Sequence, residues 1–480
     1  MSRPDATAVA SAIRSGALRA VDHARATLDA IDAANAGLNA YHEVFHEAAL
    51  ERAAAVDAMV AAGHDPGPLA GVCVAVKDNI ATTLGQTTCS SRMLEGYRSP
   101  FDATVVTRLV GAGAVIVGKT NMDEFAMGSS SETCAWGVVR NPHDPTRTPG
   151  GSSGGSAAAM AAGLCDLSLG SDTGGSIRQP AAFCGIVGLK PTYGRISRWG
   201  LVAFGSSLDQ IGPFASTVRD AALAYGVMAG VDAHDSTSAA VTVDDWQATP
   251  PIDPKALRIG VPSQYLRNND PAVAEALDRA LALLRAAGAT IVDIDLPMTD
   301  HGISTYYVIA PAEASSNLAR FDGIRYGHRA DQRAGEGLEE LYARSRSEGF
   351  GAEVQRRIML GTYVLSSGYY DAYYDRALRI RRLIKQEFDT AFGQCDMILG
   401  PTAPTAAFAI GGVTDPLQMY MNDVYTVNTN IAGIAGISLP GGTDRTSGHA
   451  LPVGVQLQAP AFAESRLLRV SELLERLLSA

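Results

Sequence analysis

Apolar residues recur along the first quarter of the chain with two different spacings, one typical of helices and one typical of strands. Residues 8–62 are rich in alanine, with leucine, isoleucine and valine at helical spacing, and predict two or three helices with a short strand near residues 38–45. Residues 71–80 alternate β-branched and smaller side chains and predict a strand. Residues 102–120 predict a helix capped by Asp102, a glycine-rich stop and a second strand.

The same alternation continues to the end of the chain. Residues 256–262 predict a strand, and residues 271–297 predict a helix that ends near Gly288 and then another strand. Buried strands are also predicted within 396–405 and 454–460, before a final amphipathic helix. Helices that alternate with apolar strands are typical of an α/β fold. We therefore expect a single large domain in which a mixed β-sheet is covered by helices on both faces.

Composition narrows the class of protein. Of 480 residues, 46% are hydrophobic and 19% are charged, which is typical of a globular protein. The net charge of −11 does not favour a nucleic-acid-binding surface, and the densest basic stretch, Arg376 to Lys385, is interpreted as a solvated helix face. The six cysteines lack C-x-x-C spacing, so we expect buried thiols in a reducing compartment and no metal site. No signal peptide and no membrane span are expected, which predicts a cytoplasmic protein.

Two glycine- and serine-rich loops carry the candidate chemistry: GGSSGGS at 150–156 and DTGGS at 172–176. An alanine-rich stretch between them predicts a buried helix and a short strand. The spacing does not match a phosphate-binding loop of either common type. One such loop could be purely structural, with glycines that form turns and serines that cap helices. A catalytic serine site would explain the presence of two.

A catalytic serine needs a base to accept its proton. None of the nine histidines lies in either loop, and His143, the nearest in sequence, is interpreted as an ordinary loop histidine. Lysine remains, in a serine–lysine variant of the catalytic triad. Lys77 ends an apolar strand, where loss of solvation would lower its pKa toward the range in which the neutral amine accepts a proton.

Taken together, the segments GGSSGGSAAA, DTGGSIRQP and the upstream KDNI resemble the amidase signature family, and the match runs from Gly151 to Pro180. The resemblance implies that Ser176 is the nucleophile, that Ser152 is the bridging serine in a cis-peptide loop, and that Lys77 is the base. It also implies an oxyanion hole formed by backbone N–H groups of the loop Thr173, Gly174, Gly175 and Ser176. Asp172 and Arg178 would hold this loop without taking part in catalysis.

Other segments resemble one branch of this family, the glutaminase subunits of bacterial tRNA-dependent amidotransferases. They include NMDEFAMGSSSE (121–132), FDGIRYG (321–327) and GYYDAYY (368–374). The resemblance implies that the amide donor is glutamine, or asparagine, and that the ammonia passes to a large subunit. That subunit would use ATP and Mg²⁺ to amidate Glu-tRNA(Gln), Asp-tRNA(Asn) or both, and a small subunit would clamp the heterotrimer. This chain itself would need no cofactor.

The pocket for glutamine needs a fixed cation and a fixed anion, because the substrate carries an α-carboxylate and an α-ammonium group. On the resemblance these are Arg357 and Asp423, with Tyr307 lining the pocket and Ser131 as a further pocket residue. The adjacent Arg356 remains an alternative to Arg357. Two other functions stay open: a stand-alone amidase acting on small carboxamides, and an inactive structural subunit, which the intact triad disfavours.

Within the expected single domain we distinguish four parts. A helical N-terminal segment (1–65) precedes the catalytic core with the triad (66–220), and residues 255–480 complete the sheet and the substrate pocket. The polar, proline-rich residues 235–254 fit a linker between domains equally well, and we assign them to a surface excursion within one domain.

Overall fold

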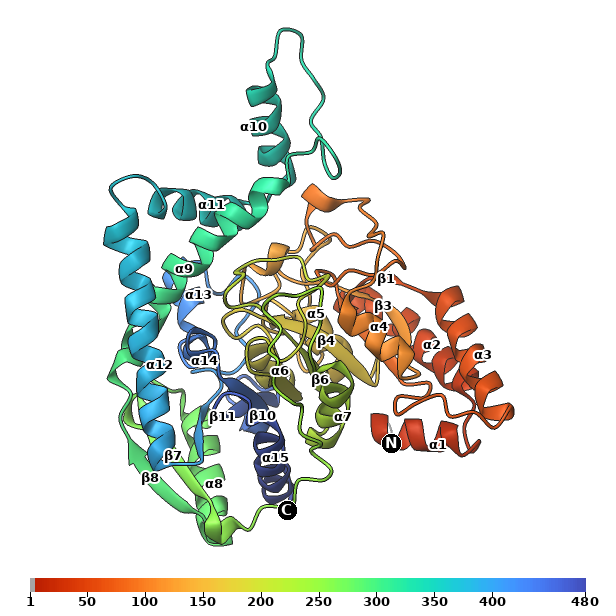
Figure 1. Cartoon of the computed structure of the whole chain (residues 1–480), viewed down its shortest axis with the longest axis vertical. Coiled ribbons are helices and arrows are strands. Elements are labelled where there is room, and N and C mark those ends of the chain that lie inside the picture. Colours follow the sequence, from red (N-terminus) through yellow and green to blue (C-terminus); the bar gives the residue numbers. More distant parts are fainter. Residues whose placement is uncertain (1–4) are drawn as a thin grey trace.

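The structure is a computed structural model that describes residues 5–480. Residues 1–4 lie outside the described residues. They begin the predicted N-terminal segment, in which no signal peptide is expected. Within this range, eleven strands form one continuous sheet in the order β1-β3-β2-β4-β6-β5-β10-β11-β9-β7-β8 (Figure 1). β2 pairs in parallel with β3 and β4, and β7 with β8 and β9, whereas the other pairings are antiparallel. The predicted mixed sheet is confirmed.

The strands fall into two groups along the chain. The bounds of the first six are β1 (Tyr41–Val44), β2 (Cys73–Lys77), β3 (Val115–Thr120), β4 (Leu167–Asp172), β5 (Val187–Lys190) and β6 (Gln210–Ala215). The others are β7 (Arg258–Pro262), β8 (Thr290–Ile294), β9 (Met397–Pro401), β10 (Ala435–Asp444) and β11 (Leu451–Ala459). β2, β3 and β4 are buried along their whole length, which explains their nearly continuous runs of small and apolar residues.

Helices flank both faces of the sheet, as predicted (Figure 1). α5 (Gly154–Ala161) and α6 (Arg178–Cys184) pack on the central strands, and so do α7 (Val218–Met228), α8 (Pro271–Ala287) and α15 (Glu464–Ser479). α1 (Ala6–Arg14), α2 (Ala20–Leu38), α3 (His46–Ala61) and α4 (Thr104–Gly111) gather around the β1 end. A further layer consists of α9 (Gly302–Asn317), α10 (Leu338–Gly349), α11 (Ala352–Val364), α12 (Arg376–Gln394), α13 (Pro416–Met421) and α14 (Val427–Ala432).

Most elements lie close to their predicted positions. α8 ends before Gly288, whose φ of 107° places it in the left-handed region that favours glycine. The predicted Asp102 cap is wrong: Ala103 is the N-cap of α4, and the Asp102 carboxylate instead accepts hydrogen bonds from the Thr83 backbone N–H (2.6 Å) and hydroxyl (3.0 Å). β5, β6 and β10 were not predicted.

Within residues 235–254 only Pro254 belongs to a helix, because it begins the short 3-10 helix that precedes β7. Trp246 anchors this segment: its side chain is buried, and the Arg469 guanidinium lies 4.7 Å from its ring centre. Among residues 5–480, none of the helices is long and apolar enough to span a bilayer. All six cysteines are buried thiols without disulfides.

Candidate active site

The carboxyl ends of two neighbouring parallel strands position the candidate chemistry. β2 ends at Lys77 and β4 ends at Asp172, and Val76 pairs with Leu169 across the parallel ladder. The first glycine/serine loop leads into α5, and the second connects β4 to α6. Because parallel strands end at the same edge of a sheet, the second loop begins beside Lys77. The first loop contacts both Lys77 and the second loop.

The Lys77 amine is held by serine hydroxyls. Its side chain is completely buried, and Nζ lies 2.8 Å from both Ser152 Oγ and Ser153 Oγ. A third hydroxyl, Ser171 Oγ, lies 2.9 Å away and also accepts a hydrogen bond from the Asn79 amide (2.9 Å). No carboxylate makes a direct ion pair with Lys77 within residues 5–480, so neutral groups surround the amine.

This environment lowers the pKa of Lys77 to about 7, chiefly because burial disfavours the charged ammonium. The carboxylates of Asp123, Asp172 and Asp209 act in the opposite direction and moderate the effect. A buried lysine with this pKa is a substantial fraction neutral at pH 7, which is the form that accepts a proton.

The two loops contact each other through their backbones. The Ser153 N–H donates to the Ser176 carbonyl (3.3 Å), and the Gly151–Ser152 peptide bond is cis, as the family resemblance implies. In the described part of the chain, no hydrogen bond joins the hydroxyls of Ser152 and Ser176. Catalytic hydrogen bonds are often long in unliganded sites and shorten when substrate binds. Ser176 is buried, with 8% of its surface exposed.

The Asp172 carboxylate organises the second loop. It accepts hydrogen bonds from the backbone N–H groups of Gly175 (2.8 Å) and Ile177 (3.2 Å). The Gly175 N–H of the predicted oxyanion hole is therefore already engaged, which leaves the other N–H groups of the loop as its candidate donors. Gly175 has a φ of 143°, and a side chain there would meet Thr426, so only glycine fits.

A buried ion pair fixes Asp172 in turn. Arg178 Nη2 lies 3.1 Å from Asp172 Oδ1, and both side chains are fully buried. Burial alone would raise the pKa of Asp172, but the charge and hydrogen bonds of Arg178 outweigh burial and lower it. Arg178 Nη2 also donates to the Thr426 carbonyl (3.0 Å) and the Asn430 side chain (2.6 Å), so this pair ties the loop to α14.

Asp423 lies against the same loop from the C-terminal part of the chain. A side chain at Gly175 would come within 3.1 Å of Asp423 Oδ1, and Thr426, three residues further on, donates to the Gly174 carbonyl (2.8 Å). The Asp423 carboxylate accepts a short hydrogen bond from the Ser129 hydroxyl. Burial raises the pKa of Asp423 to about 7.

Arg357 on α11 lies among aromatic rings. Its guanidinium carbon is 5.1 Å from the centre of the Tyr307 ring, with the rings of Phe204 and Tyr420 at 5.7 and 5.6 Å. Its Nε donates to Glu353 (2.8 Å). Burial acts to lower the pKa of Arg357, but neighbouring Tyr307 and Glu353 outweigh it and raise the pKa, so this cation is permanent.

The structure distinguishes the two neighbouring arginines. The Arg357 side chain is 4% exposed and that of Arg356 is 54% exposed, although Glu353 pairs with both. Both line a cavity of about 270 Å³ between α11 and α13, together with Ser129 and Tyr420. Arg357 thus has the burial and aromatic contacts expected of a binding residue, whereas Arg356 lies at the rim.

Ser131, which we expect in the pocket, binds the backbone of the first loop. Its hydroxyl donates to the Gly150 carbonyl (2.9 Å) and accepts from the Gly154 N–H (3.1 Å), so it holds the first loop. Ser129, two residues earlier, lines the cavity and binds Asp423. The sequence pattern does not single out Ser129, Ser153 or Ser171; the one signal for Ser129 is its position in the run of three serines.

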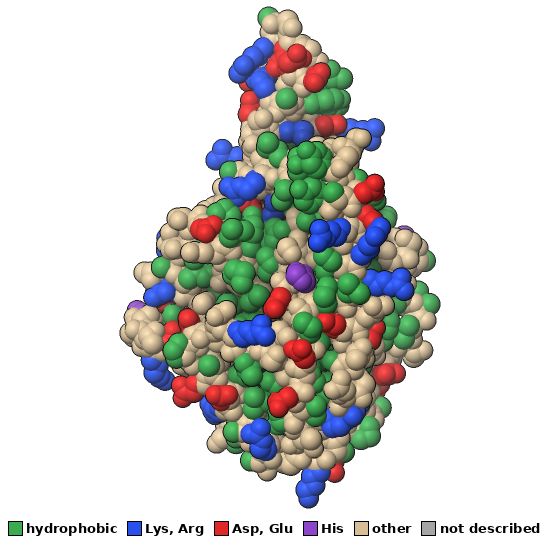
Figure 2. All heavy atoms as spheres, turned by 90° about the vertical axis from the view of Figure 1, so that its left-hand side faces the viewer, with side chains coloured by type: hydrophobic (Ala, Val, Ile, Leu, Met, Phe, Trp, Pro, Cys, Tyr) green, Lys and Arg blue, Asp and Glu red, His purple; other side chains and the backbone are tan. Residues whose placement is uncertain are grey.

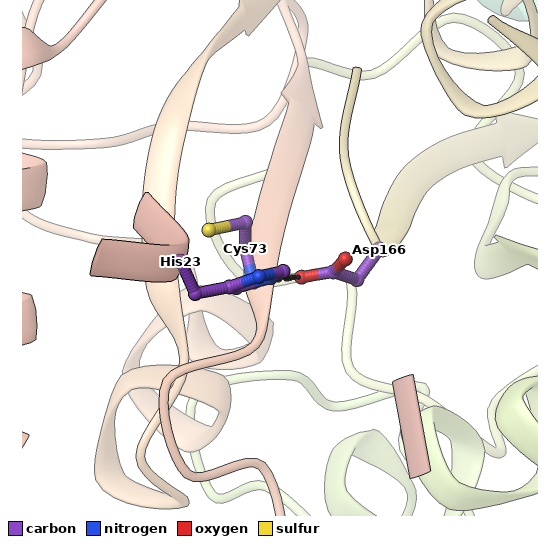
Figure 3. A group of neighbouring side chains, drawn as sticks. All are labelled: His23, Cys73 and Asp166. Atoms are coloured by element: carbon purple, nitrogen blue, oxygen red, sulfur yellow. Dashed lines mark hydrogen bonds and ion pairs between the residues drawn. The ribbon is translucent and has the colours of Figure 1, made fainter. Parts of the chain in front are cut away.

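A separate cluster lies at the opposite end of β2 (Figure 3). His23 Nε2 lies 2.7 Å from Asp166 Oδ2, which also accepts the Cys73 backbone N–H (2.7 Å). The potential ligand atoms of the three side chains lie within 4.8 Å of one another, but the Cys73 sulfur points away from the contact between His23 and Asp166. The hydrogen bonds connect α2, β2 and the start of β4.

The site and fold match known proteins over almost the whole chain. A family profile described as Amidase matches residues 22–468, and the chain belongs to this family of enzymes. It is 55% identical to the A subunit of the glutamyl-tRNA(Gln) amidotransferase of Carboxydothermus hydrogenoformans, over 97% of this chain and 95% of that protein. It is 54% identical to the protein of the same name from Synechococcus sp., over 96% and 94%.

Solved structures show the same relationship. The A subunit of the glutamyl-tRNA(Gln) amidotransferase of Thermotoga maritima superposes with a TM-score of 0.77 at 42% identity, covering 93% of this chain and 89% of that chain. The peptide amidase of Stenotrophomonas maltophilia gives a TM-score of 0.84 at 29% identity, covering 100% and 98%. The same fold therefore occurs in an amidotransferase subunit and in a peptide amidase.

Proposed function

We propose that this chain is the glutaminase subunit of a tRNA-dependent amidotransferase, and that it hydrolyses glutamine through an acyl-enzyme on Ser176. One observation supports the chemistry above all others: the buried Lys77 amine, with its lowered pKa, lies 2.8 Å from Ser152 Oγ, in the loop that touches Ser176. The identity of 52–55% to proteins named as A subunits supports the assignment to this branch.

In this mechanism Ser176 Oγ attacks the side-chain carbonyl carbon of glutamine. The Ser176 proton passes to Ser152, whose own proton passes to neutral Lys77. Backbone N–H groups of the 173–176 loop stabilise the oxyanion, an effect of about 3–4 kcal/mol per donor in comparable sites. The relay then returns a proton to the departing nitrogen, and the C–N bond breaks to release ammonia. Water hydrolyses the resulting ester to glutamate and restores Ser176.

Substrate recognition would use two buried charged residues: Arg357, which lines the cavity, and Asp423, which is bound by the cavity residue Ser129. Arg357 would bind the α-carboxylate of glutamine, Asp423 would bind its α-ammonium group, and Tyr307 would hold the Arg357 guanidinium in place. Thr173, Gly174, Gly175 and Ser176 form the loop between this pocket and Lys77. Asparagine carries the same two charged groups and is the alternative donor.

The names of the relatives, which describe one component of a larger enzyme, support partners for this chain. In our proposal a large subunit binds ATP, Mg²⁺ and the misacylated tRNA, Glu-tRNA(Gln) or Asp-tRNA(Asn), and uses the ammonia. A small subunit clamps the heterotrimer, which works in the cytoplasm. This chain binds no cofactor of its own.

The second candidate is a stand-alone amidase, and the likeness to a peptide amidase favours it. Comparing ammonia release from glutamine and from a peptide amide separates the two. We expect kcat/KM to be higher for glutamine and to disappear in Ser176→Ala with the fold retained. Undiminished release by Ser176→Ala would refute the nucleophile, and preference for the peptide amide would favour the stand-alone enzyme.

A further inference from the structure

The direction in which the Lys77 amine points is set by its neighbours. Figure 2 shows charged side chains scattered over the outer surface of the molecule, whereas the amine of Lys77 lies completely inside it. Within residues 5–480, its hydrogen bonds all go to oxygen atoms of Ser152, Ser153 and Ser171. These oxygens therefore decide where the hydrogens and the lone pair of the amine lie.

The hydrogens of the amine set a requirement for the relay. A neutral amine has two N–H groups and one lone pair, and the relay needs the lone pair to face Ser152 Oγ, 2.8 Å away. An N–H group in that direction would donate to the hydroxyl whose proton Lys77 has to accept. Both N–H groups must therefore be bound by other acceptors.

Ser153 is fixed as the acceptor of the first N–H group. Its hydroxyl donates to the Ser171 carbonyl (3.1 Å), and its oxygen accepts the Ser171 backbone N–H (3.3 Å). A hydroxyl has one proton and two lone pairs, so a single lone pair remains on Ser153. Lys77 Nζ lies 2.8 Å from this oxygen, which can bind the amine only as an acceptor.

Ser171 accepts the second N–H group, and Asn79 holds it in place. Ser171 Oγ lies 2.9 Å from Lys77 Nζ and accepts a hydrogen bond from the Asn79 amide, also 2.9 Å long. This bond selects one staggered position of the serine hydroxyl and uses one of its lone pairs, which leaves the other for Lys77. Ser171 lies in β4 and Asn79 follows β2, so the contact joins the two strands that position the base.

The Asn79 side chain is poorly suited to a purely structural role. It is 2% exposed, and its Oδ1 atom is buried and accepts no hydrogen bond from the part of the chain that the structure describes. A buried polar atom without a partner lowers the stability of a fold. Residues that cost stability in this way are typical of functional sites.

We propose that Asn79 is a positioning residue for the base: through Ser171 it binds one N–H group of neutral Lys77, so that the lone pair faces Ser152. This inference rests on the proposed function, because only a proton relay from Ser152 to Lys77 requires a fixed lone pair. Without the amide, the Ser171 hydroxyl turns away, the amine rotates, and an N–H group competes with the lone pair for Ser152.

The test uses the full chain purified with its partner subunits. Asn79→Leu keeps the size of the side chain without the amide, Ser171→Ala removes the hydroxyl, and Ser171→Thr retains it. Asn269→Leu is the matched control, because Asn269 also has a buried Oδ1 without a partner among the described residues, and its amide binds the Tyr265 carbonyl (2.8 Å). We expect kcat for glutamine hydrolysis to fall about tenfold in Asn79→Leu and Ser171→Ala, with KM unchanged. Ser171→Thr and Asn269→Leu should resemble the wild type.

The pH profile separates positioning from a structural defect. In Asn79→Leu the Lys77 ammonium loses a fixed hydrogen-bond acceptor, which lowers the pKa of Lys77 further. The rise of kcat should therefore move to lower pH by about 0.5 to 1 pH unit, although its plateau falls. A variant that merely contains less folded enzyme would lower the plateau and leave the midpoint in place. The other ionisable groups that act on Lys77 are unchanged in this variant: Asp123, Asp172, Asp209 and Cys89.

A double variant tests whether Asn79 acts through Ser171. We expect Asn79→Leu/Ser171→Ala to be no slower than Ser171→Ala, because both changes remove the same contact. Additive losses would overturn the proposal, and so would an unchanged pH midpoint or a wild-type kcat in Asn79→Leu. A higher kcat in Ser171→Ala would show that this hydroxyl occupies the lone pair, which also overturns it. If Asn79→Leu does not fold, the smaller Asn79→Ala takes its place with the same expectations.

Labelling with a fluorophosphonate, whose phosphorus is attacked by Ser176 Oγ with loss of fluoride, gives a readout that does not involve glutamine. Its rate in Asn79→Leu should show the same fall and the same movement in pH. If the wild type hydrolyses glutamine but neither readout responds to the variants, the positioning role fails and the glutaminase stands. If labelling responds as expected but the wild type releases no ammonia from glutamine, the glutaminase alone is contradicted.

Discussion

Two buried regions lie on either side of the 173–176 loop. One holds an amine whose charge can change, and the other holds a permanent charge. Around Lys77, neutral hydroxyls surround one ionisable amine, and burial brings its pKa to about 7. Around the cavity, the permanent cation of Arg357 is held by aromatic rings and lies in the same pocket region as Asp423. The first arrangement suits proton transfer, because the charge of the amine can change. The second suits recognition of a zwitterion, because the charge of the Arg357 cation cannot change.

The largest expected effect comes from removing the amine. Lys77→Met preserves the length and burial of the side chain but removes the proton acceptor, and we expect kcat for glutamine hydrolysis to fall by at least about 10³-fold, as in other disrupted triads. Steady-state ammonia release measures this, and circular dichroism and thermal unfolding test the fold. Activity within tenfold of wild type in a folded variant would remove Lys77 from the mechanism.

A smaller effect, expressed in KM, is expected on the recognition side. Asp423→Asn keeps the shape of the side chain but removes the charge that we assign to the α-ammonium group. Since a hydrogen bond to a charged group is worth about 1.5–3 kcal/mol, KM for glutamine should rise by about 10- to 100-fold with a smaller change in kcat. The exposed Asp389→Asn on α12 is the matched control. A loss confined to kcat would place Asp423 in the chemical step.

The pH dependence separates the two regions within one enzyme. Lys77 accepts a proton only when neutral, so kcat should rise as pH increases through about 7. Asp423 binds an ammonium group only when ionised, so KM should fall over the same range. In Asp423→Asn the pH dependence of KM should disappear and that of kcat should remain. Loss of both would show that a single group governs them.

The smallest effects distinguish two neighbouring serines. Ser129→Ala removes the hydroxyl that binds Asp423, and we expect an increase in KM of about fivefold, near 1 kcal/mol. Ser131→Ala removes hydrogen bonds to the Gly150 and Gly154 backbone and should lower the free energy of unfolding by about 1 kcal/mol, with KM unchanged. Urea denaturation and glutamine kinetics on both variants provide the comparison. The reverse pattern would restore Ser131 to the pocket.

The difference between the two regions also explains what the sequence could predict. Lys77, Ser152 and Ser176 lie in short motifs whose glycines, serines and strand end have a direct chemical meaning, and the structure brings the motifs together. Arg357 and Asp423 belong to separate elements, α11 and the segment after α13, and only the family resemblance indicated them. Ser171 lies inside β4 next to the conspicuous DTGGS loop, and nothing in its local pattern distinguishes it from a packing residue.

The unpredicted strands share a physical cause. β6 contains Gly212 and Pro213, and β10 contains Pro440 followed by two glycines, residues that normally indicate turns. β5 has only four residues, too few to show a period of two. These strands form because neighbouring strands and buried helices supply contacts that local sequence does not describe. Similarly, Asp102 resembles a helix cap in sequence, but its carboxylate binds the loop at Thr83.

The role of Ser176 as nucleophile can be tested by acid-quenching the enzyme during glutamine turnover and measuring the mass of the peptide that contains Ser176. We expect the addition of one γ-glutamyl group on Ser176, sensitive to hydroxylamine and absent in Ser176→Ala. A modification on another residue, or rapid ammonia release with no covalent intermediate even when hydrolysis is slowed at low temperature, would contradict it.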